Sequence, residues 1–524
     1  MKKRILMLGA GFMQGVAIRC AKERGWSVTA VDGNPFAPCR DLADRFEPID
    51  LKDREELASF ARKLQREEGL DGVFTAATDF SASVARVAEA CGLPGHSFEA
   101  AMNASDKLLM RGCFGRSGVP SPAFIGIDGS NRIEIPARLD AAGLAFPLVV
   151  KPVDNMGARG CRLARNPAEL EGAVSDALGY SRTGRAIVEE YMDGPEFSAE
   201  ALVYDGEIHM TGLADRHIFF SPYFIEMGHT IPTAFPESDA DRLVEVFKAG
   251  IRSLGLTHGV AKGDLKLTSR GPMIGEIAGR LSGGYMSGWT FPYSSGIDLT
   301  GAALELAVGN RPVSLEPAQN WTSAERAWIS IPGRVSSVSG YEKARTIPYI
   351  RDVFPRAKPG DTVSFPMNNV EKCGNCLAVA PERALAIRAA EEACRCVFIR
   401  LEPANPDTSA FLESGPGLPD AFPPDAFPAG SSSPGSVEAV TVSLALPSGS
   451  VSVAVPRDLA SRIDELADWQ GRTLRSALLQ ACIVEPGLTD CLNGNDGKAV
   501  TGYWRALLRG GIQGIVYQYD TENR

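Results

Sequence analysis

Two acidic residues occupy facing positions of a predicted β-hairpin within residues 263–284. The segment reads GDLKLTSRGPMIGEIAGRLSGG, and a predicted three-residue turn at 269–271, ending in glycine, divides it into two strands. Folding the chain about this turn pairs Asp264 with Glu276. Two carboxylates about 4 Å apart repel each other by about 1 kcal/mol in water and by about 4 kcal/mol at a protein-like dielectric constant. A cation is therefore expected between them, and Mg²⁺ prefers hard oxygen ligands of this kind.

The two strands must present these carboxylates on one face, because side chains alternate across a strand. The same folding pairs Lys266 with Ile274 and places both on the acidic face, together with Thr268. The opposite face is apolar and is expected to pack on a core; it carries Leu265, Leu267, Met273 and Ile277. Arg280 follows just beyond the second strand. The alternative interpretation is a surface hairpin whose carboxylates are solvated or paired with Lys266.

The size and composition indicate an ordinary multidomain protein. The chain has 524 residues, which suggests three or four domains, and its hydrophobic (44%) and charged (23%) fractions are typical of globular proteins. The net charge of −10 argues against nucleic acid or an anionic membrane as the main partner. The sequence has no run of about 20 apolar residues, so no membrane span is expected. Eleven cysteines without a framework spacing, and a first segment that reads as strand–turn–helix rather than signal peptide, favour a cytoplasmic protein.

The first 100 residues alternate between predicted strands and helices. Strands are predicted at 4–9, 26–32 and 70–77, and helices at 16–24 and 81–91. This alternation predicts a parallel sheet with right-handed crossovers. The glycine turn Gly9–Gly15, with Asp32 at the end of the next strand, also suits a dinucleotide. An NAD-dependent oxidoreductase is therefore a competing hypothesis, although nothing downstream has the pattern of a hydride-transfer site.

Two lysines and a glycine loop follow in the next part of the chain. Lys107 opens a predicted helix, and Lys151 ends a predicted strand that leads into the polar glycine loop 154–160. A lysine beside backbone N–H groups that a phosphate can approach closely suits a triphosphate. The strand at 187–192, IVEEYM, and Glu196 after it offer carboxylates that accept hydrogen bonds from adenine and ribose. An ordinary hairpin loop and a solvated strand edge are the alternatives.

An aromatic segment at 219–230 holds one acid and one imidazole. It reads FFSPYFIEMGHT, with Glu226 and His229 three positions apart. Aromatic side chains around such a pair are typical of a small-molecule pocket. A structural histidine is the alternative. An amphipathic helix predicted at 238–254 then leads into the acidic hairpin.

The last part of the chain changes character twice. Residues 311–402 read mainly as strands with one helix, and residues 403–437 are rich in Pro, Gly and Ser, which predicts a flexible linker. Residues 438–524 return to two alternating strands followed by two helices. This order is similar to ribbon-helix-helix DNA-binding modules, but the strands lack the basic and amide side chains that read bases. A docking or homo-oligomerisation module is the favoured interpretation.

Two cysteine pairs raise the question of a zinc site. Cys373 and Cys376 have a C-x-x-C spacing, but Cys394 and Cys396 have the wrong spacing for a zinc knuckle. Cys396 also lies in an apolar stretch. A zinc site is therefore not favoured, and the role of Cys373 and Cys376 stays open.

Residues 1–402 resemble the ATP-grasp superfamily, in particular its carboxylate–amine ligases. The order and spacing of the motifs carry this resemblance more than any single motif. It implies that ATP is held by two lysines, a glycine-rich flap, a hinge strand and a ribose-binding acid, namely Lys107, Lys151, Gly157, Ala158, Arg159, Gly160, Glu189, Glu190, Met192 and Glu196. Asp264 and Glu276 match the metal-ligand positions, which implies Mg²⁺, with Mn²⁺ as an alternative ion. Arg280 matches the family's arginine, and it and Lys151 are the implied catalytic residues.

A second, local similarity concerns the substrate. The segment 224–229, FIEMGH, is similar to the substrate loop of L-amino-acid ligases. The implied substrate contacts are Glu226, His229, Arg280, Ser282 and Gly283. Two positions depart from the family pattern, because Asp264 replaces the usual glutamate and Ala278 the usual asparagine. The resemblance is therefore compatible with either one or two bound metal ions.

The resemblance implies a multidomain chain of α/β and α+β type. The expected parts are a Rossmann-like domain at 1–100, an ATP-grasp domain at 101–310, a β-rich subdomain at 311–402, a linker at 403–437 and a small ββαα-like tail at 438–524. The implied reaction joins a small-molecule carboxylate to an amine through an acyl phosphate, releasing ADP and phosphate. An ATP-grasp carboxylase or a nucleotide-synthesis ligase is the alternative enzyme.

Overall fold

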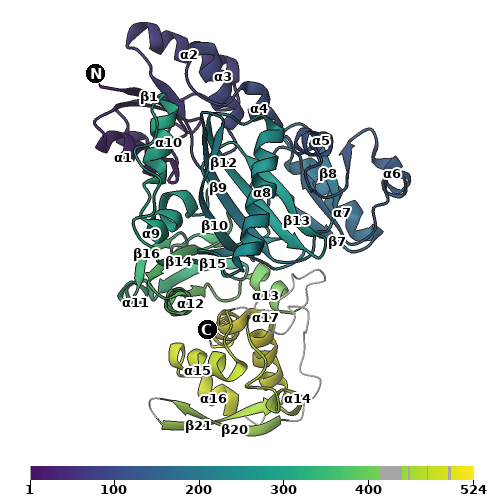
Figure 1. The fold of residues 1–524 in the computed structure, drawn as a ribbon. Coiled ribbons are helices and arrows are strands. Elements are labelled where there is room, and N and C mark those ends of the chain that lie inside the picture. The colour runs from purple at the N-terminus through teal and green to yellow at the C-terminus, as the bar shows by residue number, and fades with distance from the viewer. Residues whose placement is uncertain (1, 414–438, 447–448, 469, 494–496, 524) are drawn as a thin grey trace. The chain divides into compact units, whose positions relative to one another are not determined.

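The chain forms two compact units in the computed structural model, which describes residues 2–413, 439–446, 449–468, 470–493 and 497–523 (Figure 1). Unit 1 comprises Met1–His217, Gly228–Glu325 and Ala378–Ile387. Unit 2 comprises Ile218–Met227, Arg326–Leu377 and Arg388–Arg524. In the described part of the chain, no helix is both long enough and apolar enough to cross a membrane.

Unit 1 begins with a parallel sheet whose strands are apolar because both of its faces are covered. The strand order is β3-β2-β1-β4, and each neighbouring pair is parallel, as the alternation of strands and helices predicts. The strands are β1 (Arg4–Leu8), β2 (Ser27–Val31), β3 (Arg45–Glu47) and β4 (Gly72–Phe74). The helices are α1 (Gln14–Glu23), α2 (Arg54–Glu67), α3 (Ser81–Cys91) and α4 (Phe98–Asn103), with a 3₁₀ turn η1 (Arg40–Leu42).

A second sheet of unit 1 carries the glycine loop. Its order is β5-β8-β6-β7, and all its strand pairs are antiparallel. The elements are α5 (Lys107–Ser117), β5 (Phe124–Asp128), η2 (Arg132–Glu134), α6 (Ile135–Ala142), β6 (Leu148–Pro152), β7 (Arg162–Ala164), α7 (Pro167–Tyr180) and β8 (Arg185–Glu190). Ile127, Leu148 and Val188 lie in the apolar core between this sheet and its helices. The glycine loop therefore joins two strands, β6 and β7, of a packed sheet.

The acidic hairpin belongs to a third, mainly antiparallel sheet. Its first four strands, in the order β13-β12-β9-β10, are β13 (Gly271–Ala278), β12 (Gly259–Thr268), β9 (Glu196–Tyr204) and β10 (Glu207–Phe219). Helix α8 (Glu237–Leu254) packs across β12 and β13, with Phe247 and Ile251 fully buried (Figure 1). The remaining elements of this region are β11 (Ile225–Ile231), the π-helix η3 (Met286–Thr290), α9 (Phe291–Ser295) and α10 (Leu299–Ala307).

The turn of the hairpin is shorter than the sequence predicts. Thr268 pairs with Gly271, so the loop has two residues rather than three. Ile274 consequently pairs with Leu265 instead of Lys266, and it lies fully buried in the core rather than on the acidic face. The prediction for Ile274 was therefore wrong.

The facing of the two acids was predicted correctly, because a β-bulge compensates for the shorter turn. The register shifts by one residue between Asp264 and Leu265, which leaves Gly275 as the extra residue and pairs Asp264 with Glu276. A Cβ on Gly275 would lie 3.2 Å from the carbonyl oxygen of Asp264. The bulge thus needs a glycine, and it moves Glu276 onto the face that Asp264 occupies.

Unit 2 is built from short strands and helices. They include β15 (Gly333–Ser339), α11 (Tyr341–Thr346), β16 (Ile350–Pro355), β17 (Thr362–Val363), β19 (Phe398–Leu401), α13 (Pro406–Glu413), β20 (Ala439–Leu446), β21 (Gly449–Pro456), α14 (Arg457–Ala460), α15 (Leu474–Val484), α16 (Leu488–Asn493) and α17 (Gly497–Glu522). Strands β14 (Thr322–Trp328) and β18 (Gly374–Ala380) and helix α12 (Arg383–Cys396) carry residues of both units. Strands β20 and β21 form an antiparallel pair, followed by four helices rather than the two expected.

The tail after residue 438 packs on the earlier part of unit 2. The Arg400 guanidinium forms ion pairs with Asp520 and with Glu485, the latter at 2.7 Å. Gln513 Nε2 donates to the carbonyl oxygen of Ile399 at 2.9 Å. The tail is therefore described with unit 2, and the domain boundary predicted at 438 stays a prediction.

The predicted linker is helical where the structure describes it. Residues 406–413 form α13, and Thr408 and Phe411 are buried on that helix. The expectation of a flexible linker is wrong for these residues, because their apolar positions pack against α17. The rest of the predicted linker lies outside the described residues.

The kink of α17 generates a stability prediction. Gly511 has φ 56° and ψ −149°, which only glycine adopts readily, and a Cβ on Gly514 would lie 2.1 Å from the carbonyl oxygen of Ala506. We expect Gly514→Ala to destabilise unit 2 by about 1–3 kcal/mol, because the clash involves backbone. Hydrogen exchange of the peptides covering 497–522 should become faster.

Gly502 is the matched control on the same helix. The nearest atom to a Cβ at Gly502 is 3.9 Å away, so Gly502→Ala should leave exchange unchanged or slow it. Equal exchange in the two variants would contradict the proposed packing at the kink.

Candidate active site

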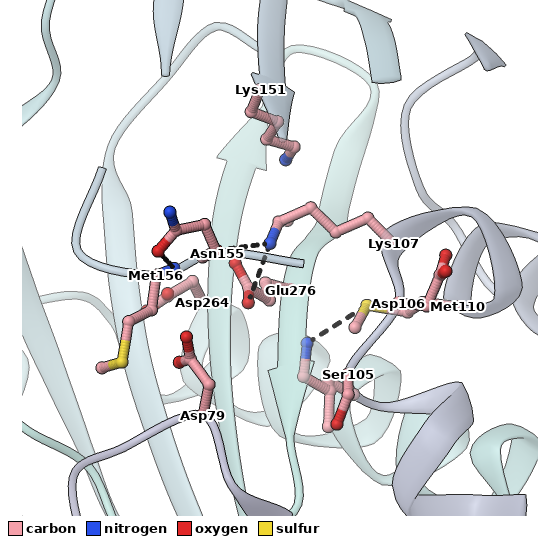
Figure 2. Close-up of polar contacts among 12 residues, drawn as sticks. Asp79, Ser105, Asp106, Lys107, Met110, Lys151, Asn155, Met156, Asp264 and Glu276 are labelled. Atoms are coloured by element: carbon pink, nitrogen blue, oxygen red, sulfur yellow. Dashed lines mark hydrogen bonds and ion pairs between the residues drawn. The ribbon is translucent and has the colours of Figure 1, made fainter. Parts of the chain in front are cut away.

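The candidate site lies in unit 1, around the two acids of the hairpin (Figure 2). Lys107 stands at the first position of α5, where Asp106 caps the helix by accepting from the N–H groups of Leu108 and Leu109. The Lys107 ammonium lies 3.4 Å from Glu276 Oε1 and donates to the carbonyl oxygen of Asn155 at 3.0 Å. The cap of one helix and the start of the glycine loop thus hold a buried lysine over the hairpin.

The Asp264 carboxylate is surrounded by cations. Ser198 Oγ donates to its Oδ1 at 3.0 Å, Lys262 pairs with the same oxygen, and Arg216 Nη1 lies 3.4 Å away. Burial alone would raise the pKa of Asp264, but Arg216 and Lys262 hold that pKa well below its usual range. Asp264 is therefore ionised at neutral pH.

Glu276 is ionised for a similar reason. Burial would raise the pKa of Glu276, while Lys107 and Lys151 lower it below its ordinary value against the repulsion of Asp264. The hairpin therefore presents two adjacent negative charges, partly balanced by lysines from two other elements.

These two carboxylates fit a magnesium ion bound mainly through its substrate. The described residues contain no group of three or more His, Cys, Asp or Glu side chains arranged to hold a metal. Asp264 and Glu276 supply two hard oxygen ligands, and Mg²⁺ commonly takes its remaining ligands from water and phosphate oxygens. The cysteines fit a metal less well, since burial raises the pKa of Cys373 to about 12 and keeps its thiol neutral.

The glycine loop is anchored at its base and strained at its tip. Asp154 accepts from Ser181 Oγ at 2.9 Å and from the backbone N–H groups of Arg182 and Thr183 at 3.0 and 2.9 Å. Three residues at the tip have positive φ, namely Gly157 (68°), Ala158 (59°) and Gly160 (68°). Arg159 Nη1 donates to the side chain of Asn155 at 3.2 Å. The loop thus exposes backbone N–H groups from a fixed base.

Glu189 occupies a different place from the one predicted. It is 2% exposed, and its two oxygens pair with Arg111 Nε and with Lys151 Nζ, each at 2.7 Å. Burial would raise the pKa of Glu189, but the two cations hold it below its ordinary value. Both oxygens of the carboxylate are thus paired with protein cations, and the carboxylate positions Lys151; the predicted ATP contact of Glu189 stays a prediction.

Glu190 points the other way, because neighbouring residues of β8 face opposite sides of the sheet. It pairs with Arg270 at 2.7 Å and accepts from the N–H of Ala123 at 3.1 Å. The side chains of Glu189 and Glu190 therefore lie on opposite faces of β8, and the ATP contacts predicted for the two residues stay predictions.

The predicted ribose acid lies beside the predicted hinge. Glu196 is 2.9 Å from Lys266 Nζ, and Lys266 also donates to the carbonyl oxygen of Met192 at 3.0 Å. The same ammonium stands 5.0 Å from the centre of the Tyr191 ring. One lysine of the hairpin therefore ties Met192 and Glu196 to the acidic platform.

Glu226 and His229 lie on opposite faces of β11. Residues three apart on a strand face opposite sides, and the two fall in different units. His229 Nδ1 lies 2.9 Å from Glu325 Oε2, with both side chains buried, whereas the backbone of Glu226 is held by Asn369 and Lys372. His229 thus pairs with a buried acid of unit 1, and the substrate contacts predicted for Glu226 and His229 stay predictions.

Arg280 and the segment after it close the site. Arg280 Nε is buried and has no hydrogen-bond partner among the described residues, while its Nη1 donates to the carbonyl oxygen of Leu281 at 3.1 Å. Leu281 forms a parallel bridge with Ala76, which joins this segment to the end of the N-terminal sheet. The backbone N–H of Ser282 donates to Glu200 at 2.7 Å. Gly283 follows at the start of the turn that leads to η3.

A small pocket borders Arg280 and contains no charged side chain. It is lined by Met13, Val16, Ala17, Ala76, Ala77, Leu281, Ser282, Tyr285, Ser287, Gly288, Trp289 and Thr300.

Two acids of the site escaped the sequence analysis. Glu200 is fully buried on β9 and accepts from Ser282 N and Ser287 Oγ. Asp79 follows β4 and pairs with Arg182 at 2.8 Å. Glu200 could have been identified from the sequence as a charged residue within an apolar strand. Asp79 could have been identified as an acid after the carboxyl end of a parallel strand, where parallel sheets bind ligands.

Replacement of Glu189 distinguishes a structural role, in which its carboxylate pairs with Arg111 and Lys151, from a contact with the nucleobase of ATP. Glu189→Gln leaves two buried cations uncompensated, so we expect a loss of about 3–5 kcal/mol in unfolding free energy. Glu190→Gln breaks a partly exposed pair and should cost about 1 kcal/mol or less. Denaturant titration measures both. Stability equal to that of the native chain, together with a raised KM for ATP, would instead indicate a nucleobase contact at Glu189.

Glu200 generates a pH prediction. Burial raises its pKa from 4.5 to about 7, despite hydrogen bonds from Ser287 and Ser282 and the nearby charges of Lys262 and Arg280. The folded state therefore binds the proton more tightly than the unfolded chain, and stability falls as pH rises from about 4.5 to about 7. Glu200→Gln should remove up to about 3 kcal/mol of this decline. Unfolding free energies at pH 5 and pH 8 test it, and an unchanged difference between them would refute the raised pKa.

Three family models match the chain. A model described as an ATP-grasp N-terminal domain matches residues 18–95, and one described as an ATP-grasp domain matches residues 144–288. A model described as L-amino acid ligase C-terminal domain 2 matches residues 327–402.

Relatives and solved structures agree with these matches. The chain is 28% identical to carnosine synthase 1 of Gallus gallus over 59% of this chain and 36% of that protein. It is 27% identical to alanine–anticapsin ligase of Bacillus subtilis over 44% of this chain and 53% of that protein. The matches thus span about a third to about half of these two relatives.

The fold is similar to a solved L-amino acid ligase from Bacillus licheniformis. The TM-score is 0.68 at 22% identity, covering 76% of this chain and 99% of that one. The fold, the three matched segments and the ligase relatives agree, and together they make this chain similar to ATP-grasp ligases.

Proposed function

We propose that this protein is an ATP-dependent carboxylate–amine ligase that acts on an amino-acid-like substrate and releases ADP and phosphate. The observation that carries the proposal is the pair of ionised carboxylates, Asp264 and Glu276, beneath Lys107 and beside the glycine loop. Carnosine synthase and alanine–anticapsin ligase, named among the relatives, support an amino-acid-like substrate.

Four parts of the chain divide the binding of ATP in this proposal. Lys107 and Lys151 neutralise phosphate oxygens, and the N–H groups of the 157–160 loop donate to them. Met192 and Glu196 receive the adenine and ribose. Mg²⁺, held by Asp264 and Glu276, supplies charge that stabilises the phosphates during transfer.

The chemistry needs no protein nucleophile. An oxygen of the substrate carboxylate attacks the γ-phosphorus, the bond to the β-phosphate oxygen breaks, and an acyl phosphate and ADP result. The amine then attacks the acyl carbon, phosphate leaves with the electron pair of the C–O bond, and the nitrogen loses a proton. Arg280, whose Nε has no hydrogen-bond partner among the described residues, donates to the acyl oxygen that gains negative charge when the amine attacks the acyl carbon. Positioning and electrostatics thus carry the catalysis.

The experiment for this function is a phosphate-release screen. The protein is incubated with ATP, MgCl₂ and amino acids, singly and in pairs, and ADP and amide products are identified by mass spectrometry. Amide formation with equal amounts of ADP and phosphate is the expected result. ADP formation that requires bicarbonate, or absorbance change of a nicotinamide without ADP, would replace the proposal with a carboxylase or an oxidoreductase.

Glu276→Gln tests the metal platform. The loss of one charge on the bound ion should lower ATP turnover at least about 100-fold, while the fold stays intact because Gln occupies the same volume. Glu207→Gln, at an exposed acid on β10, is the control and should retain full turnover. Full activity of Glu276→Gln would refute the metal assignment.

A further inference from the structure

Asp79 belongs to the N-terminal part of unit 1 yet faces the site built by the hairpin. The parallel bridge between Ala76 and Leu281, and a hydrogen bond from Ala77 N to Leu281 O at 3.1 Å, hold the two chain segments side by side. Asp79 and Arg280 lie next to these bridged residues. Figure 2 shows the Asp79 side chain turned toward Asp264 and Glu276.

One oxygen of Asp79 remains available. Arg182 Nη2 contacts Oδ2 at 2.8 Å, and the other oxygen, Oδ1, accepts no hydrogen bond from any described residue. The side chain is 15% exposed. An ion pair on one oxygen and no donor from the described residues on the other are the geometry of a carboxylate that can accept a further donor.

The surrounding charges do not fully compensate Asp79. The charged groups facing it are Arg280, Arg182 and Lys107, which are attractive, and Glu276, which is repulsive. Burial outweighs the three cations, and the pKa of Asp79 is raised above its ordinary value. An additional positive charge at Oδ1 would offset this burial.

Arg280 offers the complementary charge nearby. Its buried Nε has no partner among the described residues, so it can donate to an anionic oxygen. A carboxylate oxygen and a guanidinium N–H that both lack a partner among the described residues, on chain segments joined by the Ala76–Leu281 bridge, complement a zwitterion.

We propose that Asp79 binds the ammonium group of an amino carboxylic acid whose carboxylate lies toward Arg280. The inference rests on the proposed ligase function and specifies its carboxylate donor. The bound ammonium stays protonated, so this nitrogen is not the nucleophile and the molecule reacts only through its carboxylate. The enzyme should accordingly prefer amino acids over the same carboxylic acids without the amino group.

The test compares amino acids with their deamino analogues. The probes are L-alanine and propanoate, L-leucine and 4-methylpentanoate, and L-phenylalanine and 3-phenylpropanoate. Hydroxylamine serves as the common amine, because it converts an acyl phosphate into a hydroxamate that is measured directly, with release of phosphate. The preference in kcat/KM for each amino acid over its analogue is determined at saturating ATP and MgCl₂.

Asp79→Asn is the decisive variant. We expect kcat/KM for the amino acid to fall about 10–100-fold, as for a lost charge-assisted hydrogen bond, while kcat/KM for the deamino analogue and KM for ATP stay unchanged. Asp79→Glu keeps the charge and should restore part of the preference. Asp41→Asn, at an exposed acid in the same part of unit 1, should keep the full preference. The increase in melting temperature on adding ATP reports that each variant is folded.

Each result has a distinct meaning. An unchanged preference in a folded Asp79→Asn overturns the inference but leaves the ligase function standing. An equal loss for both members of each pair, with a raised Mg²⁺ requirement, also overturns it, because Asp79 then acts on the metal. Hydroxamate and phosphate formed by the native protein from none of the six acids would refute the underlying ligase proposal for these substrate classes.

Discussion

The facing of Asp264 and Glu276 is the constraint on which the rest of the site depends. Two like charges on adjacent strands in a desolvated cleft are tolerated only when cations surround them. The structure brings these cations from separate elements, with Arg216 on β10 and Lys107 on α5. The positions of α5 and of the glycine loop behind it are therefore coupled to the charge of the hairpin. A ligand that carries both phosphates and a divalent cation would complement these charges, because its phosphates would meet the cations and its divalent cation would meet the two carboxylates.

Buried acids have three different roles in this cleft. The two hairpin acids present charge to the open site. Glu189 is enclosed by Arg111 and Lys151, so its charge orients a lysine and is not offered to a ligand. Glu200 accepts from backbone and side chain of the 282–287 segment, so its carboxylate holds that segment in place. Two quantities distinguish these roles: the burial of the carboxylate and the number of its oxygens that pair with protein groups. Neither can be read from the sequence, which gives only the residue type.

Much of the fold and part of the site could be predicted from periodicity and motif order. The parallel N-terminal sheet, the glycine loop after Lys151 and the pairing of Asp264 with Glu276 all follow from local patterns. The register between the turn and Gly275 was mistaken, because the turn is one residue shorter than predicted and a bulge at Gly275 then restores the predicted pairing of the acids. Contacts of the tail with the earlier part of unit 2, such as that of Arg400 with Asp520, 120 positions later, could not be predicted, because they join residues far apart in the sequence.

The sequence alone determined which chemistry was available: two lysines, a glycine loop and two acids at spacings that match one superfamily. Tertiary structure decided which of the acids meet the cleft. Glu189 and Glu190 are neighbours in sequence, yet the sheet turns one toward Arg111 and the other toward Arg270. Asp79 and Arg280 are two hundred positions apart, and a bridge between Ala76 and Leu281 brings them to one place. The physical reason is that burial and charge compensation depend on distances in space, which residue spacing along the chain does not record.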